Sequence, residues 1–439
     1  MEKRVYIRTY GCQMNERESE GLRAVLGDCG YEIVSDEQSA DIILLNTCSI
    51  REQAEAKAIG KSNLIGKNRE KFVGIIGCMA QNLGETIYKK SPHTRLIVGP
   101  NGLEKIPEYL DQLIRNPDRR IMDIAPHVID KRFAAAHDTK KVKTSVFVSI
   151  MQGCNMRCAY CIVPKTRGPE QYRSMEDIID EVRWLAGRGT QEITLLGQIV
   201  NHYGMGKMPS IGGKSPFVQL LEKIQDIDSI RRIRFMSPHP DGFKGDLIDA
   251  YGNLSKLCPH VHLPLQSGSD KILRAMKRSY KREQFLSIVA ALREKVPTIS
   301  ISTDIIVGFP GETEEDFQMT CDLFDGVKFD MAFIFKYSPR PGTVAERLGD
   351  QICQEIKEKR NQILLKKVEQ YSKAYNESMV GTVKEVLVEG RARRGTGQFE
   401  GHTPEHKKVI FKGTEDRIGQ IIDVYIEGST ISTFLGKII

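Results

Sequence analysis

Short apolar runs alternate with amphipathic stretches along the N-terminal part of the chain. Such runs are typical of buried strands, and apolar residues at helical spacing are typical of helices packed on a sheet. The pattern predicts strands at Val5–Tyr10, Asp41–Thr47 and Phe72–Gly77, with helices over Glu16–Leu26 and Arg51–Ile65. Strands separated by helices form a parallel sheet with crossovers of one hand. We therefore expect an α/β fold that begins with an open parallel-sheet domain over residues 1–118.

The alternation resumes after residues 119–143, a charged segment without clear periodicity that we expect to be a linker. Ser174 is a predicted helix N-cap, with Asp177 at the capping-box position. Six strand-like runs follow one another: Ser145–Met151, Glu192–Leu196, Arg232–Met236, His260–Leu265, Ser300–Val307 and Ala332–Lys336. They fit a partial TIM-like (βα)6 barrel over residues 144–376, whose sites lie on the loops after the strands.

The pattern changes again after a long amphipathic helix predicted over Gln351–Met379. Gly-rich turns then separate short strands, predicted at Thr382–Val388, Lys408–Phe411, Ile421–Ile426 and Thr430–Leu435. Several short strands without helices indicate a small β-barrel of the kind that binds oligonucleotides, here over residues 377–439. Three domains also agree with a length of 439 residues.

The composition, 40% hydrophobic and 28% charged, is that of a globular protein. No apolar run approaches the ~20 residues of a membrane span. The N-terminus leads directly into a strand pattern without the apolar stretch of a signal peptide, so we expect a cytoplasmic protein without membrane contact. Disulfides are not expected in that reducing compartment, and metal ligation becomes the leading account of ten cysteines.

A net charge of +7 permits a polyanionic partner but does not require one. Basic residues cluster in four places: Lys140, Lys141 and Lys143; Arg231, Arg232 and Arg234; Lys357, Lys359 and Arg360; Arg391, Arg393 and Arg394. Together with Lys407 and Lys408, the last cluster suits phosphate contacts. Because Thr382–Ile439 holds nine basic and eight acidic residues, any RNA contact there must use a local face.

Cys154, Cys158 and Cys161 form a Cx3Cx2C motif on a predicted polar loop. Thiolates hold iron–sulfur clusters, and three of them leave one iron of a four-iron cluster with an open position for chemistry. The alternative is a zinc knuckle or a group of buried thiols. Zinc sites usually contain two CxxC-like pairs or nearby histidines, and neither occurs in this stretch, so the motif favours an iron–sulfur cluster.

Cys12, Cys48 and Cys78 each follow the C-terminal end of a predicted strand. These ends share one edge of an open parallel sheet, which is where such folds bind ligands. Three buried thiols in a small core are the alternative, but turn positions favour ligands, so we expect a second three-cysteine cluster. The remaining cysteines, Cys29, Cys258, Cys321 and Cys353, are expected to be structural.

The Cx3Cx2C motif with the aromatic residue Tyr160 before its last cysteine resembles the signature of the radical S-adenosylmethionine (SAM) superfamily. The resemblance implies that SAM chelates the open iron and is cleaved to a 5′-deoxyadenosyl radical. It places Tyr160 near the adenine. The cofactors would supply the radical chemistry, and the protein would bind and orient them.

The whole domain order resembles the radical SAM methylthiotransferases, which end in a TRAM-like β-barrel. Two segments, TYGCQMN at Thr9–Asn15 and NTCSIRE at Asn46–Glu52, are similar to the branch that acts on isopentenylated adenosine in tRNA. Two other branches act on threonylcarbamoyl-adenosine in tRNA and on an aspartate of a ribosomal protein. Their Lys-Val and Pro-Lys pairs after the first cysteine are absent here.

The resemblance implies two 4Fe–4S clusters, with SAM bound at the Cx3Cx2C cluster and an auxiliary cluster on the other three cysteines. One SAM would donate a methyl group to sulfur, and a second would provide the radical that abstracts hydrogen from C2 of the adenine beside the anticodon. C2 has no leaving group, so acid–base catalysis offers no route. The implied partners are tRNA at its anticodon loop, an electron donor such as a flavodoxin or ferredoxin, and a sulfur source; we expect a monomer.

Five residues at predicted strand ends match family motifs and are candidates for SAM binding: Gln198, Gln266, Ser267, Asp304 and Gly308. Turn capping is the alternative role for Gln266 and Ser267. Ile199 stands where this branch usually has Asn, whereas Asn201 and Tyr203 are retained.

Three readings of the function remain open from the residues. The leading one is methylthiolation of isopentenyl-adenosine in tRNA. The second keeps the chemistry but changes the substrate to threonylcarbamoyl-adenosine or a ribosomal-protein aspartate. The third is a non-catalytic RNA-binding protein whose cysteines hold zinc.

Overall fold

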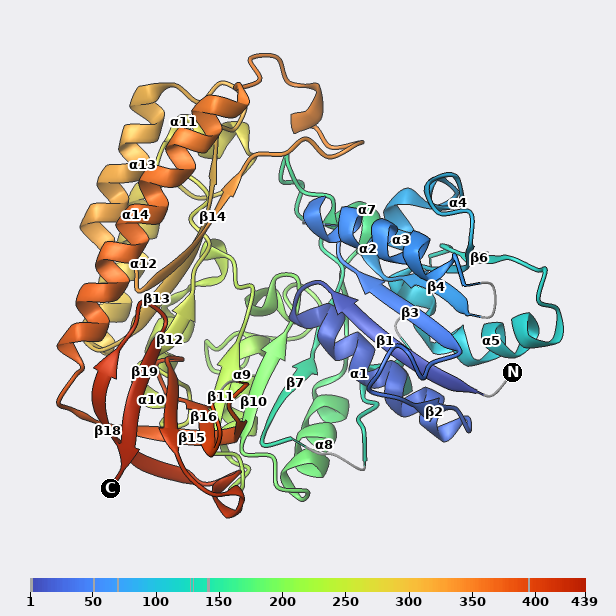
Figure 1. Cartoon of the computed structure of the whole chain (residues 1–439). Coiled ribbons are helices and arrows are strands. Elements are labelled where there is room, and N and C mark those ends of the chain that lie inside the picture. Colours follow the sequence, from blue (N-terminus) through green and yellow to red (C-terminus); the bar gives the residue numbers. More distant parts are fainter. Residues whose placement is uncertain are drawn as a thin grey trace.

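The computed structural model describes residues 3–49, 52–68, 71–126, 128, 130–139, 143–393 and 395–439. The chain forms an N-terminal sheet flanked by helices, a central curved array of strands with helices on its outside, and a C-terminal β-barrel (Figure 1). The fold class expected from the sequence is confirmed. Within the described residues, no helix is both long and apolar enough to cross a bilayer.

The N-terminal sheet has six parallel strands in the order β2-β1-β3-β4-β5-β6. Its strands are β1 (Arg4–Tyr10), β2 (Glu32–Ile33), β3 (Ile42–Thr47), β4 (Phe72–Ile76), β5 (Thr94–Val98) and β6 (Ile121–Asp123). Its helices are α1 (Gln13–Asp28), α2 (Glu52–Ile65), α3 (Cys78–Leu83), α4 (Thr86–Lys90), η1 (Pro100–Lys105) and α5 (Ile106–Arg115). α1 and α5 contribute to the hydrophobic core on one face, and α2, α3 and α4 to the core on the other. β3 and β4 are therefore buried throughout, which explains their unbroken apolar runs.

The segment expected to be a linker is in part ordered structure. Ile121–Asp123 pairs with β5 as the sixth strand, and α6 (Lys131–Ala134) follows it. A three-residue strand is too short to carry a period, and only its pairing with β5 defines it.

Six strands form the central domain as two parallel three-stranded sheets, β11-β10-β7 and β12-β13-β14. The strands are β7 (Ser145–Ser149), β10 (Glu192–Leu196), β11 (Arg232–Phe235), β12 (His260–His262), β13 (Ser300–Val307) and β14 (Met331–Lys336). An isolated bridge between Ile233 and Leu257 connects the sheets. The six strands expected from the sequence are thus present as a partial barrel.

The helices of this domain lie on the outside of the strands, except for α7, which packs against α3 of the N-terminal domain (Figure 1). They are α7 (Val163–Arg167), α8 (Met175–Ala186), α9 (Pro216–Gln225), α10 (Gly245–Asn253), α11 (Asp270–Ala275), α12 (Arg282–Lys295), α13 (Glu314–Val327) and α14 (Gln354–Ser378). Short elements join them: β8 (Met151–Gln152), β9 (Gln171–Tyr172), η2 (Val200–His202), η3 (Pro240–Gly242) and η4 (Ala345–Arg347). Ser174 caps α8, accepting a hydrogen bond from the main-chain N–H of Asp177, as predicted.

A buried ionic network fastens the N-terminal domain to the central one. Arg17 on α1 lies 3.7 Å from the carboxylate of Glu181 on α8, and both side chains are almost fully buried. His137 and Arg173 bind the same carboxylate. Breaking a buried network of this kind leaves charges uncompensated, so the two domains are held in a defined orientation.

The C-terminal part is a closed barrel with strand order β15-β16-β17-β19-β18. Its elements are β15 (Val383–Arg391), β16 (Gln398–His402), β17 (Lys408–Lys412), η5 (Glu415–Arg417), β18 (Ile421–Ser429) and β19 (Thr433–Ile438). The sequence did not predict β16, because Phe399 and Gly401 are its only fully inward residues and the segment carries little apolar signal.

Much of the basic charge noted in the sequence is used inside the fold. Arg232 donates to the carbonyl of His402 (2.7 Å) and Arg234 to that of Thr403 (2.8 Å), so both fasten the C-terminal barrel to β11. Arg360 is buried against Glu312. The guanidinium groups of these three arginines therefore have structural roles within the fold, which their clustering in the sequence did not indicate.

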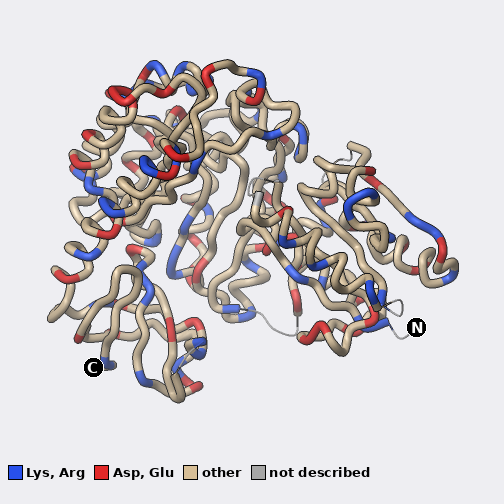
Figure 2. The backbone as a smooth tube through the Cα atoms, turned by 45° about the horizontal axis from the view of Figure 1, so that its top comes forward, with Lys and Arg blue, Asp and Glu red and all other residues tan. Residues whose placement is uncertain are grey.

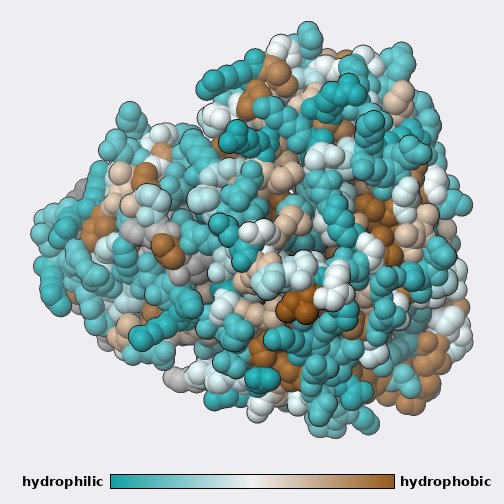
Figure 3. Space-filling model, turned by 180° about the vertical axis from the view of Figure 1, so that it is seen from behind, coloured by the Kyte–Doolittle hydropathy of each residue, from teal (hydrophilic) through white to brown (hydrophobic). Residues whose placement is uncertain are grey.

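The charges that remain are dispersed. On the C-terminal barrel Arg391 pairs with Glu415 and Lys408 with Glu400; Arg394, Lys140 and Lys141 lie outside the described residues. Figure 2 shows acidic and basic residues interspersed along the backbone. The face seen in Figure 3 is largely hydrophilic, with hydrophobic residues in small separate groups.

Candidate active site

Three predicted ligands, Cys12, Cys48 and Cys78, meet at the C-terminal edge of the N-terminal sheet; we name them the sheet-edge triad. Cys12 is the N-cap of α1, Cys48 follows β3, and Cys78 is the first residue of α3. The main-chain N–H of Cys48 donates to the carbonyl of Tyr10 (2.9 Å), which joins the turns after β1 and β3. A hydrogen bond with Cys48 lowers the pKa of Cys12 to about 6 against the effect of burial.

Two buried asparagines fix the turns that carry this triad. Asn46, at the end of β3, accepts a hydrogen bond from Nδ2 of Asn15 (3.1 Å) and donates to the Asn15 carbonyl (2.9 Å) and to Ser19 (3.0 Å). The amide oxygen of Asn15 accepts from the main-chain N–H of Cys12 (3.3 Å). A paired buried amide is costly to disturb, so the network holds Cys12 in place.

The central domain contributes a cation to the sheet-edge triad. Arg167, the last residue of α7, is 3% exposed and donates to the carboxylate of Glu18 on α1 (2.6 Å). Burial raises the pKa of the Cys78 thiol to about 11, and the charge of Arg167 opposes that rise. Sequence reasoning missed Arg167, because nothing in the local pattern distinguishes a buried arginine from a surface one.

The other three ligands, Cys154, Cys158 and Cys161, lie on the loop between β8 and α7; we name them the loop triad. Two main-chain hydrogen bonds of 3.1 Å shape this loop. The N–H of Cys154 donates to the carbonyl of Gly168, and the N–H of Cys161 donates to the carbonyl of Cys158. Burial raises the pKa of Cys154 to about 11 and that of Cys161 to about 12, and the charge of Cys158 adds to both. The three thiols therefore lie within electrostatic reach of one another.

The loop triad also has an arginine neighbour, Arg278, which is partly buried. Nη1 of Arg278 lies 3.5 Å from the sulfur of Cys158. Burial would lower the pKa of Arg278, but Tyr280, Tyr160 and Cys158 outweigh that effect and raise it. Tyr160 packs beside an apolar cluster of Ala159, Ile272, Met276, Phe309, Tyr337 and Ala345, which connects the loop to α11 and to the segment after β14.

Both triads have the donor chemistry of an iron–sulfur site. In the described part of the chain, no His, Cys, Asp or Glu side chains converge in threes on one point, as ligands of a single ion do. Cysteines of a four-iron cluster bind different iron atoms, so a cluster site does not need such convergence. Each triad instead combines three thiols with one guanidinium, that of the buried Arg167 or that of the partly buried Arg278.

The five SAM candidates lie at or beyond the C-terminal ends of the barrel strands. Gln198 follows β10, Gln266 and Ser267 follow β12, and Asp304 and Gly308 lie in and just after β13. The amide oxygen of Gln198 is buried and finds no hydrogen-bond partner among the described residues. A buried acceptor of this kind suits a bound ligand.

The other candidates are engaged with the fold. The hydroxyl of Ser267 accepts from the N–H of Ser269 (3.3 Å), which is the capping role considered as the alternative. The main-chain N–H of Gln266 donates to the carbonyl of Asp304 (2.8 Å), and the carboxylate of Asp304 lies 3.2 Å from His262. Gln266 and Asp304 therefore join the segment after β12 to strand β13.

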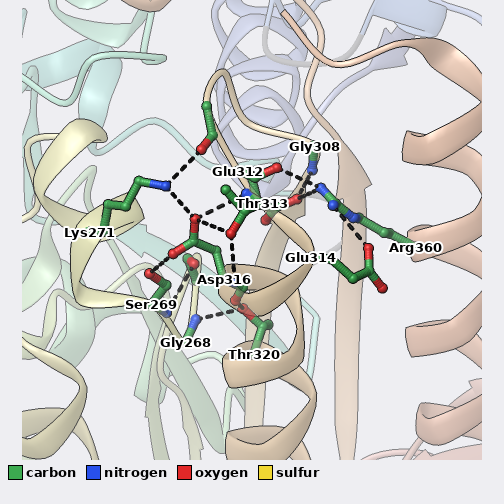
Figure 4. A network of polar contacts seen from close by, with 12 residues as sticks. Gly268, Ser269, Lys271, Gly308, Glu312, Thr313, Glu314, Asp316, Thr320 and Arg360 are labelled. Atoms are coloured by element: carbon green, nitrogen blue, oxygen red, sulfur yellow. Dashed lines mark hydrogen bonds and ion pairs between the residues drawn. The ribbon is translucent and has the colours of Figure 1, made fainter. Parts of the chain in front are cut away.

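A polar network supports these loops from below (Figure 4). Asp316 at the start of α13 accepts from the hydroxyl of Ser269 (2.6 Å) and the ammonium of Lys271 (2.7 Å). Burial alone would raise the pKa of Asp316, but these bonds and those from Thr313 outweigh it and lower the pKa to about 2. One carboxylate thus ties the loop after β12 to α13.

A second buried carboxylate holds the loop after β13 in the same way. Glu312 accepts from the main-chain N–H of Gly308 and from Arg360 on α14, both at 2.7 Å (Figure 4). Burial raises its pKa, and the contacts with Gly308 and Arg360 partly offset the rise. The predicted role of Gly308 stays a prediction, but the structure gives its N–H a partner within the loop.

Ile199, which departs from the family motif, and the retained residues Asn201 and Tyr203 are all buried. Asn201 exchanges hydrogen bonds with the main chain of His239 (2.9 and 2.8 Å), and the hydroxyl of Tyr203 donates to the carbonyl of Arg173 (2.8 Å). Ile199 is 6% exposed. Asn201 and Tyr203 therefore shape the loop after β10 from inside the fold.

The remaining cysteines divide into two groups. Cys258 and Cys321 are buried, as expected for structural residues. Cys29 and Cys353 are exposed, at the C-cap of α1 and the N-cap of α14. Their exposure was not predicted, because both lie at helix ends, which the apolar periodicity does not mark.

Three family models match successive parts of the chain. They are "Uncharacterized protein family UPF0004" over residues 4–99, "Radical SAM superfamily" over residues 148–324 and "TRAM domain" over residues 377–438. Among solved structures, a radical S-adenosylmethionine methyltransferase, TsrM from Kitasatospora setae, matches with a TM-score of 0.55. That match covers 79% of this chain and 74% of the other at 15% identity, and it supports the fold.

Curated relatives match over almost their whole length. A protein of Methylacidiphilum infernorum is 48% identical over 98% of this chain and 94% of its own, and one of Opitutus terrae is 47% identical over 99% and 97%. Both are named tRNA-2-methylthio-N(6)-dimethylallyladenosine synthase, which supports the leading reading over the two alternative substrates and over a zinc protein. The chain belongs to this family of tRNA-2-methylthio-N(6)-dimethylallyladenosine synthases, within the radical SAM superfamily.

Proposed function

We propose that this protein methylthiolates C2 of N6-dimethylallyladenosine beside the anticodon of tRNA. In this proposal the loop triad holds the cluster that binds SAM, and the sheet-edge triad holds an auxiliary cluster. The observation that carries it is a sequence identity of 47% and 48%, over nearly the full length, with two relatives of the same name, in a chain with two cysteine triads. When bound, the clusters and SAM supply the radical and the sulfur.

The chain's own residues have separable roles in this scheme. The loop after β10 offers the unpartnered amide oxygen of Gln198 to SAM. Tyr160, beside the loop triad, would contact its adenine. Asp316 and Glu312 act at a distance, because each holds a loop against α13 or α14 rather than a ligand.

Substrate binding requires the target base to leave its stack, since C2 of a stacked adenine is not accessible to a radical. We assign recognition of the surrounding RNA to the C-terminal barrel, in keeping with its TRAM family. An electron donor such as a flavodoxin or ferredoxin and a separate sulfur source complete the reaction. We further propose a monomer whose N-terminal domain extends beyond residue 118 to include β6, with later domain boundaries at residues 143 and 376.

Mass spectrometry of tRNA nucleosides from a deletion strain tests the substrate. We expect the methylthio derivative of dimethylallyladenosine to disappear and dimethylallyladenosine to accumulate. The wild-type gene should restore the methylthio derivative. An unchanged level of the methylthio nucleoside would refute the proposal. Loss of methylthio-threonylcarbamoyl-adenosine, or an altered ribosomal-protein mass, would assign the chain to another substrate.

Iron and sulfide analysis after anaerobic purification tests the cofactors independently of the substrate. Two four-iron clusters require about eight irons and eight sulfides per chain. Zinc without sulfide would reject both clusters.

A further inference from the structure

α7 connects the two cysteine triads through a short piece of backbone. The helix begins at Val163, two residues after Cys161 of the loop triad, and ends at Arg167 beside the sheet-edge triad. It packs against α3, the helix that Cys78 begins. Arg167 therefore lies only one short helix away from the last cysteine of the loop triad.

The surroundings of Arg167 leave one side of its guanidinium without an acceptor. Nη1 binds Glu18, which is itself 7% exposed, and the guanidinium also interacts with the Cys78 thiol, whereas Nη2 is buried and makes no regular hydrogen bond to a described residue. The charge of Arg167 acts on both Cys12 and Cys78. A buried donor without an acceptor is unfavourable, so Nη2 is suited to a further acceptor at the triad.

We propose that Arg167 is a positioning residue of the auxiliary cluster and donates a hydrogen bond through Nη2 to one of its sulfur atoms. This inference rests on the proposed function, because it requires a cluster on the sheet-edge triad. Arg167 is permanently charged and planar, so it supplies both a fixed positive charge and a directed donor. Glu18 orients the guanidinium, and its negative charge partly offsets the positive charge of Arg167 near the cluster.

The electrostatic consequence has a definite sign. Reduction adds negative charge to a cluster, and a nearby cation or a hydrogen bond to sulfur stabilises that charge. Arg167 therefore raises the reduction potential of the auxiliary cluster. Glu18, whose charge raises the pKa of Cys12 and Cys78, lowers that potential.

A redox titration of the full-length reconstituted protein, followed by electron paramagnetic resonance, tests this assignment. Replacing the loop triad with alanine (Cys154→Ala, Cys158→Ala and Cys161→Ala) in a parallel background isolates the auxiliary signal. We expect Arg167→Met to change the ratio of reduced to oxidised auxiliary cluster at least tenfold toward the oxidised form, about 59 mV for one electron. Arg167→Lys keeps the charge and should stay closer to the wild type.

Glu18→Gln provides a second variant with the opposite expectation, a shift toward the reduced form. Opposite shifts separate an electrostatic role from a general disturbance of packing, which would not reverse sign. The matched control is Lys165→Met, which removes an exposed cation from the same helix and should leave the potential unchanged.

The outcomes are distinct. An unchanged potential in both Arg167→Met and Glu18→Gln, with iron and sulfide intact, overturns the role of Arg167 while leaving the proposed function standing. If Arg167→Met loses the auxiliary iron, Glu18→Gln and Arg167→Lys decide the question. Shifts of the auxiliary reduction potential in the same direction in these two variants overturn the role of Arg167. A wild-type protein without iron and sulfide refutes the proposed function itself.

Discussion

The loop triad and the sheet-edge triad present the same ligands in two different ways. Cys154, Cys158 and Cys161 lie on one loop, so their spacing in the sequence already defines the site. The sheet-edge triad extends from Cys12 to Cys78 and exists only because a parallel sheet aligns the ends of β1, β3 and β4. The first site depends on a local turn, and the second depends on a complete domain.

The two triads also share construction principles. Each has an arginine neighbour, the partly buried Arg278 at the loop triad and the buried Arg167 at the sheet-edge triad. In each, a glycine with a positive φ precedes one cysteine: Gly153 (φ 82°) and Gly77 (φ 88°). The local and the long-range site thus use the same kinds of support, although their backbones are unrelated.

The strongest test of this comparison removes one triad at a time. Replacing Cys154, Cys158 and Cys161 with alanine should remove about four of eight irons and abolish both SAM cleavage and tRNA modification. Replacing Cys12, Cys48 and Cys78 should remove about as many irons and abolish methylthiolation, while 5′-deoxyadenosine is still formed. Iron analysis, chromatography of 5′-deoxyadenosine and nucleoside mass spectrometry give the three readouts.

Cys258→Ala is the control for this experiment, because it removes a buried thiol outside both triads. It should retain the full iron content. The division of labour between the triads is wrong if loss of the sheet-edge triad also stops formation of 5′-deoxyadenosine in a chain that keeps its remaining irons.

The same contrast explains how far the sequence predicts the site. All six cysteines were predicted as ligands from spacing and from their positions after strands, because both signals are local, and their binding of iron stays a prediction. Arg167 and Arg278 could not be found, since their role depends on contacts across the fold, with Glu18 and with Cys158. Burial also gave Arg232 and Arg234 a structural role that their charge alone did not indicate.

The fold follows the same rule. β3 and β4 were predicted because unbroken apolar runs mark strands buried on both sides. β6 and β16 were missed because one is three residues long and the other carries mainly polar and small residues. Their pairing with β5, β15 and β17 defines them, and a single sequence does not contain that information.

The glycines provide a sharper comparison between the triads. Gly153→Ala would place a Cβ against the carbonyl oxygen of Pro169, whereas Gly77→Ala would place one against the side chain of Asn46. Both also put alanine in the left-handed region, at a cost of about 1–2 kcal/mol. Because backbone yields less than a side chain, we expect Gly153→Ala to lose more of the loop-triad iron than Gly77→Ala loses of the sheet-edge iron.

Iron content per chain and the paramagnetic signals of the two clusters measure this difference. Gly206→Ala, at a positive-φ glycine with open space around it, controls for backbone strain alone. Equal iron loss in Gly153→Ala and Gly77→Ala would show that strain, rather than the neighbouring atoms, limits both sites.

Asp316 tests how the loops with the SAM candidates are supported. Carboxylates hold these loops, whereas buried asparagines hold the turns of the sheet-edge triad. Asp316→Ala should destabilise the protein by about 3 kcal/mol, because it leaves Ser269, Lys271 and Thr313 without their charged acceptor. The pKa of Asp316 is lowered to about 2, so its contribution is present above the ordinary carboxyl pKa and is lost as the pH falls through about 2. Denaturant unfolding of Asp316→Asn and the wild type should therefore differ near neutral pH and converge in acid.

Matched substitution of the two arginines gives the smallest and most specific effect. Arg278→Met removes the donor to Cys158 and should slow SAM cleavage about 10–100-fold while leaving the auxiliary potential unchanged. Arg167→Met should do the reverse, shifting the auxiliary potential and sparing SAM cleavage. Arg274→Met, at an exposed position on α11, is the control. If either arginine variant changes both readouts with both clusters present, α7 couples the two sites more tightly than their separate arginines imply, and the triads act as one unit.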